Sequence, residues 1–373
     1  MWDSVLDRML RDLIRVGTLE VAFPDGRSRR YGSGEPSASV RITDPALIPR
    51  LLRSPELGLG EGYMEGTLVP EGEDGLHRLL AVLIASSTAR VPGWYGALLG
   101  LRRAGRWIAQ WNPAPRARRN VAHHYDLSGA LYDLFLDADK QYSCAYFRTP
   151  GMTLEAAQAA KKALIAAKLR LEPGMRVLDI GSGWGGLALT LARDHGARVT
   201  GVTLSEEQLK VARARTAAAG LEGQVDFLLR DYRSVTGQYD RIVSVGMFEH
   251  VGVPHYHEFF GTVARLLAPD GVMLLHTIGR NAPPAATSPW ITKYIFPGGY
   301  VPALSEVAAP IEASGLWLTD LEVWRLHYAE TLREWQRRFE ANIEAVRALY
   351  DERFCRMWRF YLVASEMTFR AGR

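Results

Sequence analysis

The 373-residue sequence contains only two cysteines, Cys144 and Cys355, which stand far apart in the chain. Two distant cysteines do not make a disulfide framework, and they favour a reducing compartment. Long apolar runs are also missing, because stretches such as 79–86 fall far short of the roughly 20 residues that cross a bilayer. The N-terminus lacks the apolar core of a signal peptide. These absences predict a cytoplasmic protein.

Asp and Glu are absent from residues 75–125, although this stretch holds eight arginines. They are Arg78, Arg90, Arg102, Arg103, Arg106, Arg116, Arg118 and Arg119. Tryptophans and leucines are interleaved with them, a pattern that suits an anionic membrane surface. A nucleic-acid surface and a solvated basic linker are the alternatives. We expect a basic amphipathic helical segment and linker over residues 76–119, and membrane association rather than nucleic-acid binding.

A glycine-rich turn at residues 181–186 is the strongest local signal. It follows the short apolar run 177–180 and precedes a helical pattern, so it indicates a strand, a tight turn and a helix whose free N–H groups face a ligand. The Gly-Lys-Ser/Thr ending of a phosphate-binding loop is missing. The next strand, 198–203, ends without the acid that a dinucleotide fold requires. Asp179 before a Gly-x-Gly-x-Gly turn has the form of an S-adenosylmethionine site.

The remaining patterns predict two domains of unequal size. Residues 1–75 alternate like strands at 17–23 and 37–43, with a helix at 44–53, and the stretch 58–66 is too glycine-rich for regular structure. From residue 120 onward, strands and helices alternate, which predicts a parallel sheet with helices on both faces. Another strand is expected at 317–324, followed by one or two long helices over 331–371. Residues 280–303, rich in Pro, Gly and aromatics, predict a lid or a lipid-facing insertion.

Several motifs coincide in the second domain and make the sequence recognisable. The stretches 123–127, 142–147, 177–186, 201–205, 247–252 and 296–300 together resemble the cyclopropane fatty acid synthase family, which includes mycolic acid methyltransferases. This resemblance implies an α/β fold of the class I methyltransferase type, Rossmann-like, with a mostly parallel seven-stranded sheet in residues 120–373. The small α+β domain at residues 1–75 resembles the extra domain of the bacterial phospholipid enzymes. A homodimer is a further implication.

The resemblance also assigns residues to two sites. It implies that S-adenosylmethionine contacts residues at the ends of the strands and in one loop. These are Tyr142, Ser143, Asp179, Gly181, Gly183, Thr203, Leu204, Gln208, Asp231 and Tyr232. It further implies a bound bicarbonate ion that serves as the base. The ligands of that ion would be the backbone N–H groups of Cys144 and Ile278 and the side chains of Glu249, His276 and Tyr328. The sequence shows no metal site, since His123, His124, His255 and His257 lack partners at suitable spacing.

The resemblance implies methyl transfer to a cis alkene in an unsaturated phospholipid, at the inner face of the membrane. An alkene is a poor nucleophile, so the methyl donor must be held in line at short range. The resulting cation suits aromatic walls rather than nucleophilic side chains. Candidates for those walls are Tyr146, Phe147, Phe248, Trp290 and Tyr294. Loss of a proton then closes a cyclopropane ring, whereas a methyl-branched or methylene product is the alternative. A nucleic-acid binder and a small-molecule N-methyltransferase are hypotheses from other classes.

Overall fold

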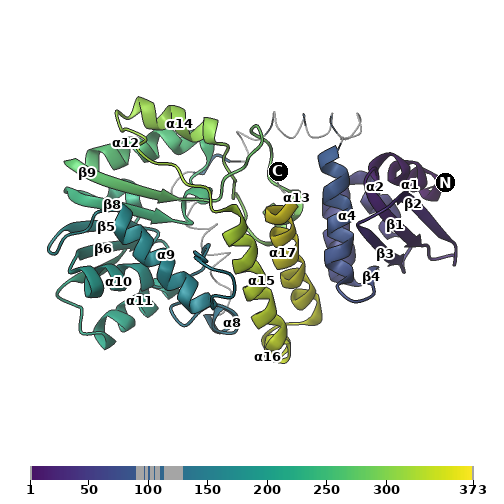
Figure 1. Cartoon of the computed structure of the whole chain (residues 1–373), viewed down its shortest axis with the longest axis horizontal. Helices are drawn as coiled ribbons and strands as arrows, with labels where there is room; N and C mark the ends of the chain where they lie inside the picture. The colour runs from purple at the N-terminus through teal and green to yellow at the C-terminus, as the bar shows by residue number, and fades with distance from the viewer. Residues whose placement is uncertain are drawn as a thin grey trace. The chain divides into compact units, whose positions relative to one another are not determined.

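The computed structural model describes residues 2–89, 110–112 and 129–371, together with Gly96, Gly100 and Gly105. The chain forms two compact units (Figure 1). The first unit comprises Met1–Ala104, Ala286–Ile295 and Tyr328–Arg373, and the second comprises Gly105–Ala285 and Phe296–His327. Most of the expected basic segment lies outside the described residues. Its first part forms the helix α4 (Gly75–Ala89).

A small mixed sheet forms the N-terminal part of the first unit. Its strands are β1 (Gly17–Ala22), β2 (Ser28–Ser33), β3 (Ser37–Ile42) and β4 (Leu68–Glu71), in the order β2-β1-β3-β4. The helices α1 (Trp2–Leu13), α2 (Leu47–Arg53) and α4 bury their apolar sides against it, around Leu6, Val21 and Leu79. This α+β arrangement agrees with the class of fold predicted for the N-terminal region.

The expectation that residues 58–66 lack regular structure was wrong, because they belong to the helix α3 (Pro55–Glu65). Pro55 occupies the first helical turn, where a missing N–H costs nothing. The glycines permit close packing. A Cβ on Gly60 would lie 2.3 Å from the Trp290 indole, and one on Gly58 would lie 2.9 Å from the α2 backbone. Close tertiary packing therefore offsets the low helix propensity of glycine.

The C-terminal helices complete the first unit. They are α15 (Arg325–Ala341), α16 (Ile343–Leu349) and α17 (Glu352–Ala371). Trp335, Phe339 and Trp358 are fully buried, so these aromatic side chains are part of the core of this unit. The short helix α13 (Pro289–Tyr294) also packs here: Trp290 contacts Phe360 at a ring distance of 4.7 Å, and Tyr294 donates a hydrogen bond to Glu61.

The second unit is built on a parallel sheet with the strand order β7-β6-β5-β8-β9. The strands are β5 (Arg176–Ile180), β6 (Arg198–Thr203), β7 (Val225–Leu229), β8 (Tyr239–Val245) and β9 (Leu267–His276). The helices are α8 (Gly129–Asp133), α9 (Leu154–Lys168), α10 (Gly186–His195), α11 (Glu206–Ala218), α12 (Tyr256–Leu266) and α14 (Leu304–Ala313). Short 3-10 turns occur at η1 (Tyr232–Ser234), η2 (Phe248–His250) and η3 (Val253–His255).

Alternation along β5 assigns its side chains to two cores. Val177 faces the cluster formed with α9, α10 and α11, whereas Leu178 and Ile180 face the cluster formed with α12. Helices therefore cover both faces of the sheet (Figure 1), as the βαβ rhythm of the sequence predicted. Side-chain caps close the first turns of two helices, since Thr153 accepts from the Ala156 N–H and Ser205 accepts from the Gln208 N–H.

The sheet has five strands in the part of the chain that is described, rather than the seven expected. Residues 317–324 alternate in polarity but form no strand. Their apolar side chains are exposed, with Trp317 at 91 % and Val323 at 79 % of full exposure, so alternation alone did not produce a paired ladder. Salt bridges from Lys168 to Asp320 and Glu322 hold this segment beside α9.

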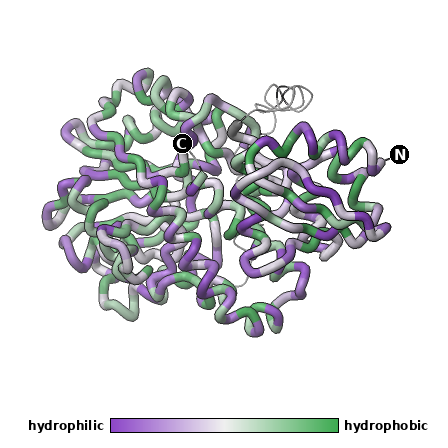
Figure 2. Tube along the Cα trace, turned by 45° about the vertical axis from the view of Figure 1, so that its right-hand side comes forward, coloured by the Kyte–Doolittle hydropathy of each residue, from purple (hydrophilic) through white to green (hydrophobic). Residues whose placement is uncertain are grey.

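Hydrophobic and hydrophilic stretches alternate along the chain (Figure 2). Across the described residues, we found no helix that combines the length and the apolar character needed to cross a bilayer.

Candidate active site

The glycine turn between β5 and α10 has the conformation that its sequence predicts. Gly181, Gly183 and Gly185 have φ angles of 85°, 53° and 85°, a region that other residues rarely adopt. A Cβ on Gly181 would approach Met247 to 2.7 Å, and one on Gly185 would approach Phe227 to 2.7 Å. Two hydrogen bonds from Gly181 N and Ser182 N to Val202 O fix the turn at the end of β6. Only glycine allows this backbone to pass so close to its neighbours.

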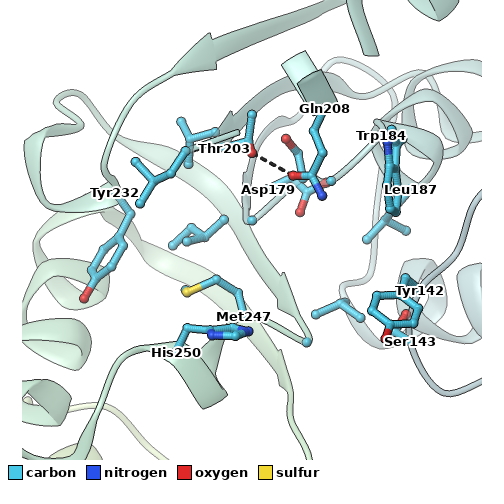
Figure 3. A pocket seen from close by; sticks show the side chains of 18 of the residues that line it. Tyr142, Ser143, Asp179, Trp184, Leu187, Thr203, Gln208, Tyr232, Met247 and His250 are labelled. Atoms are coloured by element: carbon cyan, nitrogen blue, oxygen red, sulfur yellow. Dashed lines mark hydrogen bonds between the residues drawn. The ribbon is translucent and has the colours of Figure 1, made fainter. Parts of the chain in front are cut away.

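A pocket opens at the carboxyl edge of the sheet, beside this turn (Figure 3). Its walls include all ten residues predicted to contact the cofactor, from Tyr142 and Ser143 through the glycine turn to Asp231 and Tyr232. Trp184, Met247, His250 and Asn112 also line it, and the sequence had not singled these out. The strand ends of an open parallel sheet therefore converge on one cavity, as expected for this architecture.

Polar groups at the ends of β6 and β7 are already oriented by short hydrogen bonds. Thr203 Oγ1 donates to Gln208 Oε1 at 2.9 Å, which joins the strand end to the first turn of α11. Asp231 accepts from Arg233 through both carboxylate oxygens, at 2.9 and 2.7 Å. The neighbouring Tyr232 is protonated, since burial raises the pKa of its phenol well above the ordinary value. This side of the pocket can bind hydroxyl and ring-nitrogen groups.

Asp179 is the most unusual group in the pocket. The side chain is 2 % exposed, and Oδ2 has no hydrogen-bond partner among the residues that the structure describes. Burial raises the pKa of Asp179 to about 7. A buried carboxylate without a counter-charge is costly, and such a cost is typical of a ligand site. Asp179 is therefore suited to receive a cationic ligand group.

The loop at residues 141–144 is fixed by two side chains of α9. Gln158 Nε2 donates to the carbonyl oxygens of Gln141 and Ser143, at 3.1 and 3.0 Å. One turn later, Lys161 Nζ donates to Ser143 Oγ at 2.8 Å. Tyr142 packs edge-on against Tyr132, at a ring distance of 5.3 Å. The loop is thus held firmly where it borders the pocket.

Glu249 and Ile278 form a second polar centre in the same unit. The Ile278 N–H donates to Glu249 Oε1 at 2.7 Å, whereas Glu249 Oε2 is buried and has no hydrogen-bond partner in the described part of the chain. Burial raises the pKa of Glu249, and the bond from Ile278 opposes that shift. His276, two residues before Ile278, is neutral because burial lowers its pKa to about 3, and its Nδ1 is also buried with no hydrogen-bond partner within the described ranges. Two unsatisfied acceptor or donor atoms thus remain at this centre.

Aromatic rings flank the second centre. His276 lies 4.9 Å from Trp324 by ring centroid, and Trp324 lies 4.9 Å from Tyr146. His327 packs 4.8 Å from Tyr146 and accepts the Phe147 N–H at Nδ1. Tyr146 thus belongs to this aromatic group together with Trp324 and His327, and its role as a wall of the substrate site stays a prediction. No pattern around Trp324 and His327 distinguished them from the neighbouring exposed segment.

The remaining candidates are divided between the two units. Phe248 is fully buried and stacks on Tyr256 at 4.3 Å, so it is a core residue rather than a pocket wall. Trp290 and Tyr294 belong to the first unit, where α3 and α17 surround them. Tyr328 also belongs to the first unit and packs against Phe369 at 4.8 Å. Cys144 is buried next to Ser143. Over the described ranges, no group of three His, Cys, Asp or Glu residues could hold a metal ion.

A parallel sheet of this order, with a glycine turn after its first strand and a pocket at its carboxyl edge, is the arrangement of a class I S-adenosylmethionine-dependent methyltransferase, and solved structures of such enzymes are similar to this chain. Comparison with known proteins narrows this class to a family. Residues 113–373 match the model of mycolic acid cyclopropane synthetase, and residues 5–91 match a domain of unknown function (DUF7884). The chain belongs to the mycolic acid cyclopropane synthetase family.

Similar proteins agree with this assignment. The cyclopropane-fatty-acyl-phospholipid synthase of Escherichia coli K12 is 42 % identical, over 94 % of this chain and 92 % of its own length. The tuberculostearic acid methyltransferase UfaA1 of Mycobacterium tuberculosis is 38 % identical, over 99 % of this chain and 88 % of its own length. A solved structure of mycolic acid cyclopropane synthase CmaA1 complexed with SAH and CTAB is 36 % identical with a TM-score of 0.65, and the match covers 70 % of this chain and 96 % of that one.

Proposed function

We propose that this protein transfers the methyl group of S-adenosylmethionine to the cis double bond of an unsaturated phospholipid acyl chain and forms a cyclopropane ring. The methyl carbon bonds to one alkene carbon while its bond to sulfur breaks, and the sulfur keeps the electron pair. The other alkene carbon becomes cationic. Loss of a proton from the added methyl group frees the electron pair that closes the ring, so the cofactor carbon becomes the methylene bridge.

The observation that carries the proposal is the pairing of two polar centres of different kinds in one unit. The first is the glycine-lined pocket with the unpartnered carboxylate of Asp179. The second combines the unpartnered atoms of Glu249 and His276 with a group of aromatic rings. Methylation of an amine also requires the loss of a proton, so a base alone does not distinguish the two reactions. The aromatic rings beside the second centre are what favour a substrate that passes through a carbocation.

The pocket residues fit S-adenosylmethionine. Asp179 would bind the ammonium of its methionyl part, the Thr203–Gln208 pair and Asp231 would bind the ribose and adenine, and Ser143 would bind the carboxylate. The cofactor supplies the electrophilic methyl group. The chain's own task is to hold that methyl group in line with the alkene and to exclude water, which is where most of the catalytic effect of positioning arises.

The second centre fits a small anion that bonds through several oxygens. Glu249 Oε2 and His276 Nδ1 are buried and unsatisfied, so both can bond a bicarbonate ion that also receives the Cys144 N–H. Bicarbonate would supply the base. The Ile278 N–H, expected to bind the ion as well, is bonded to Glu249 instead. Ile278 would then act by fixing the Glu249 carboxylate, and Tyr328 stays a prediction.

A second product class has specific support. A 1,2-hydride shift moves the cation to the carbon that bears the added methyl group, and loss of a proton from that methyl group then gives a methylene fatty acid. Reduction of the methylene group by a separate hydride donor would give a methyl-branched product, and a relative of 38 % identity is named a tuberculostearic acid methyltransferase. Incubating the protein with labelled S-adenosylmethionine and mono-unsaturated phospholipid distinguishes these outcomes. Ring closure and methylene formation both add CH2, so the products need fragmentation or NMR. Label found only in a soluble amine would overturn the proposal.

The basic segment supplies the membrane contact in this proposal, and places the enzyme at the inner face of the membrane. We expect the triple substitution Arg102→Gln, Arg103→Gln and Arg106→Gln to weaken binding to vesicles rich in phosphatidylglycerol about tenfold or more, since each basic residue contributes about 1 kcal/mol near an anionic surface. Sedimentation with vesicles measures the effect. Substituting the exposed Arg53, Arg148 and Arg198 removes the same charge and serves as the matched control. Equal binding by both variants would discard this role. A homodimer stays a prediction.

A further inference from the structure

Lys161 is a buried cation that the reaction described above does not use. It lies on the inner face of α9, and its side chain is fully buried. Burying an ammonium group without a carboxylate partner costs several kcal/mol, so a lysine in this position calls for a function. Ser143 is its one hydrogen-bond partner in the described part of the chain, at 2.8 Å from Nζ to Oγ.

The direction of this bond determines what Ser143 can do. The ammonium carries three N–H donors and no acceptor, so Ser143 Oγ must accept from it. The hydroxyl proton is therefore directed away from Lys161. Ser143 lines the cofactor pocket, and no hydrogen bond from its hydroxyl to a described residue is formed. A donor made more acidic by the adjacent ammonium thus remains for a ligand.

The backbone around Ser143 does not depend on Lys161. Gln158 lies one turn before Lys161 in α9. Its Nε2 donates to the Ser143 carbonyl oxygen at 3.0 Å and to the Gln141 carbonyl oxygen at 3.1 Å. The two side chains of α9 thus have different roles. Gln158 fixes the loop backbone, and Lys161 fixes the direction in which the Ser143 hydroxyl donates its hydrogen bond.

We propose that Lys161 is a positioning residue that holds the Ser143 hydroxyl as a hydrogen-bond donor for the carboxylate of the cofactor's methionyl group. This inference rests on the proposed function only in its use of S-adenosylmethionine. Asp179 takes the ammonium end of the same group. A carboxylate is the ligand element that gains most from a polarised O–H donor, because its charge strengthens the bond.

The charged surroundings support this assignment. Burial lowers the pKa of Lys161 to about 8, while Asp137 opposes that shift, with smaller effects from Cys144, Lys162 and Asp139. His276, from β9, is neutral and adds no charge. Lys161 is hence mainly protonated at neutral pH. Once deprotonated, its Nζ becomes an acceptor, and the Ser143 proton can turn toward it and away from the pocket.

The test compares two ligands by calorimetry: S-adenosylhomocysteine, which has the methionyl carboxylate, and 5′-methylthioadenosine, which lacks it. Lys161→Met should weaken S-adenosylhomocysteine binding about tenfold and change 5′-methylthioadenosine binding less than twofold. Ser143→Ala should have the same effect, and the double variant should lose no more than either single variant. Additive losses, equal losses for both ligands, or unchanged binding would each overturn the proposal.

A second measurement needs no substitution at position 161. In the unmodified protein, the affinity for S-adenosylhomocysteine relative to that of Ser143→Ala should fall as the pH rises through about 8. A constant ratio between pH 7 and 9 would contradict the inference. Neither measurement includes an acyl substrate, so a wrong assignment of the lipid would leave both results intact.

Discussion

Glu249→Gln should reduce cyclopropane formation about 100- to 1,000-fold, the range found when a positioned base or hydrogen-bonding group is removed from an active site. Gln keeps the shape of Glu and one carbonyl oxygen. That oxygen can still accept the Ile278 N–H, which now bonds Glu249 Oε1 at 2.7 Å. The amide NH2 then replaces Oε2 and presents a donor where the proposal requires an acceptor.

Stability separates this effect from damage to the fold. The ionised Glu249 is buried, and burial raises its pKa from the ordinary value of 4.5. A neutral Gln avoids the cost of burying charge, so the melting temperature of the variant should equal or exceed that of the unmodified protein. Glu312→Gln, an exposed substitution on α14, is the matched control and should leave activity within twofold. Near-normal ring formation by Glu249→Gln would refute the assigned base.

The pH dependence follows from the same carboxylate. A group with a raised pKa loses its charge earlier as the pH falls, so the ring-forming rate of the unmodified protein should decline on the acid side at a pH above 4.5. Added bicarbonate should not restore that loss, because Glu249 itself must be ionised to accept a hydrogen bond through both oxygens. The pH profile of product formation at fixed bicarbonate measures this.

The glycine-lined pocket was predictable because a simple rule locates it. Parallel strands end at one edge of the sheet, and Asp179, Thr203 and Asp231 each end a strand or follow one. Periodicity locates such strands, and glycine spacing identifies the turn. Knowledge of packing was not needed. The same holds for the helix caps Thr153 and Ser205, whose roles depend on neighbours three residues away.

Other features depend on contacts between distant segments, which periodicity does not encode. The glycines of α3 led to the prediction of an irregular segment, because nothing in the local sequence shows that Trp290 occupies the space beside Gly60. A strand was predicted at residues 317–324 because polar and apolar side chains alternate there, but a strand also needs a neighbouring strand with which to pair. Lys161 read as an ordinary helix residue, and only its burial shows that it meets Ser143.

Asp179→Asn should lower the affinity for S-adenosylhomocysteine about 100-fold at pH 8. The substitution leaves the ammonium group of the bound ligand without its charged partner, which costs about 2 to 4 kcal/mol of binding free energy. Titration calorimetry measures the loss. Asp226→Asn, on the exposed side of β7, is the matched control and should leave the affinity unchanged.

The affinity of the unmodified protein should depend on pH in a defined direction. Burial raises the pKa of Asp179 to about 7 in the free protein, so below that pH the ligand must displace a proton. The affinity should then rise with pH by up to about tenfold per unit, and level off above pH 7. In Asp179→Asn this dependence should vanish. A pH-dependent affinity that survives the substitution would assign the titration to another group.

The same substitution should stabilise the free protein, and this opposite sign is the sharper test. Because the folded-state pKa of Asp179 lies above its unfolded value, the folded protein holds an extra proton between about pH 4 and 7, and stability is lost as the pH rises through that window. Asn carries no charge, so Asp179→Asn should gain roughly 1 to 3 kcal/mol at pH 8 and almost nothing at pH 4. A residue that lowers stability and raises ligand affinity is retained for the ligand. If Asp179→Asn instead lowered both the stability of the free protein and the ligand affinity, Asp179 would be a structural residue, and the main support for its role in binding the cofactor would be removed.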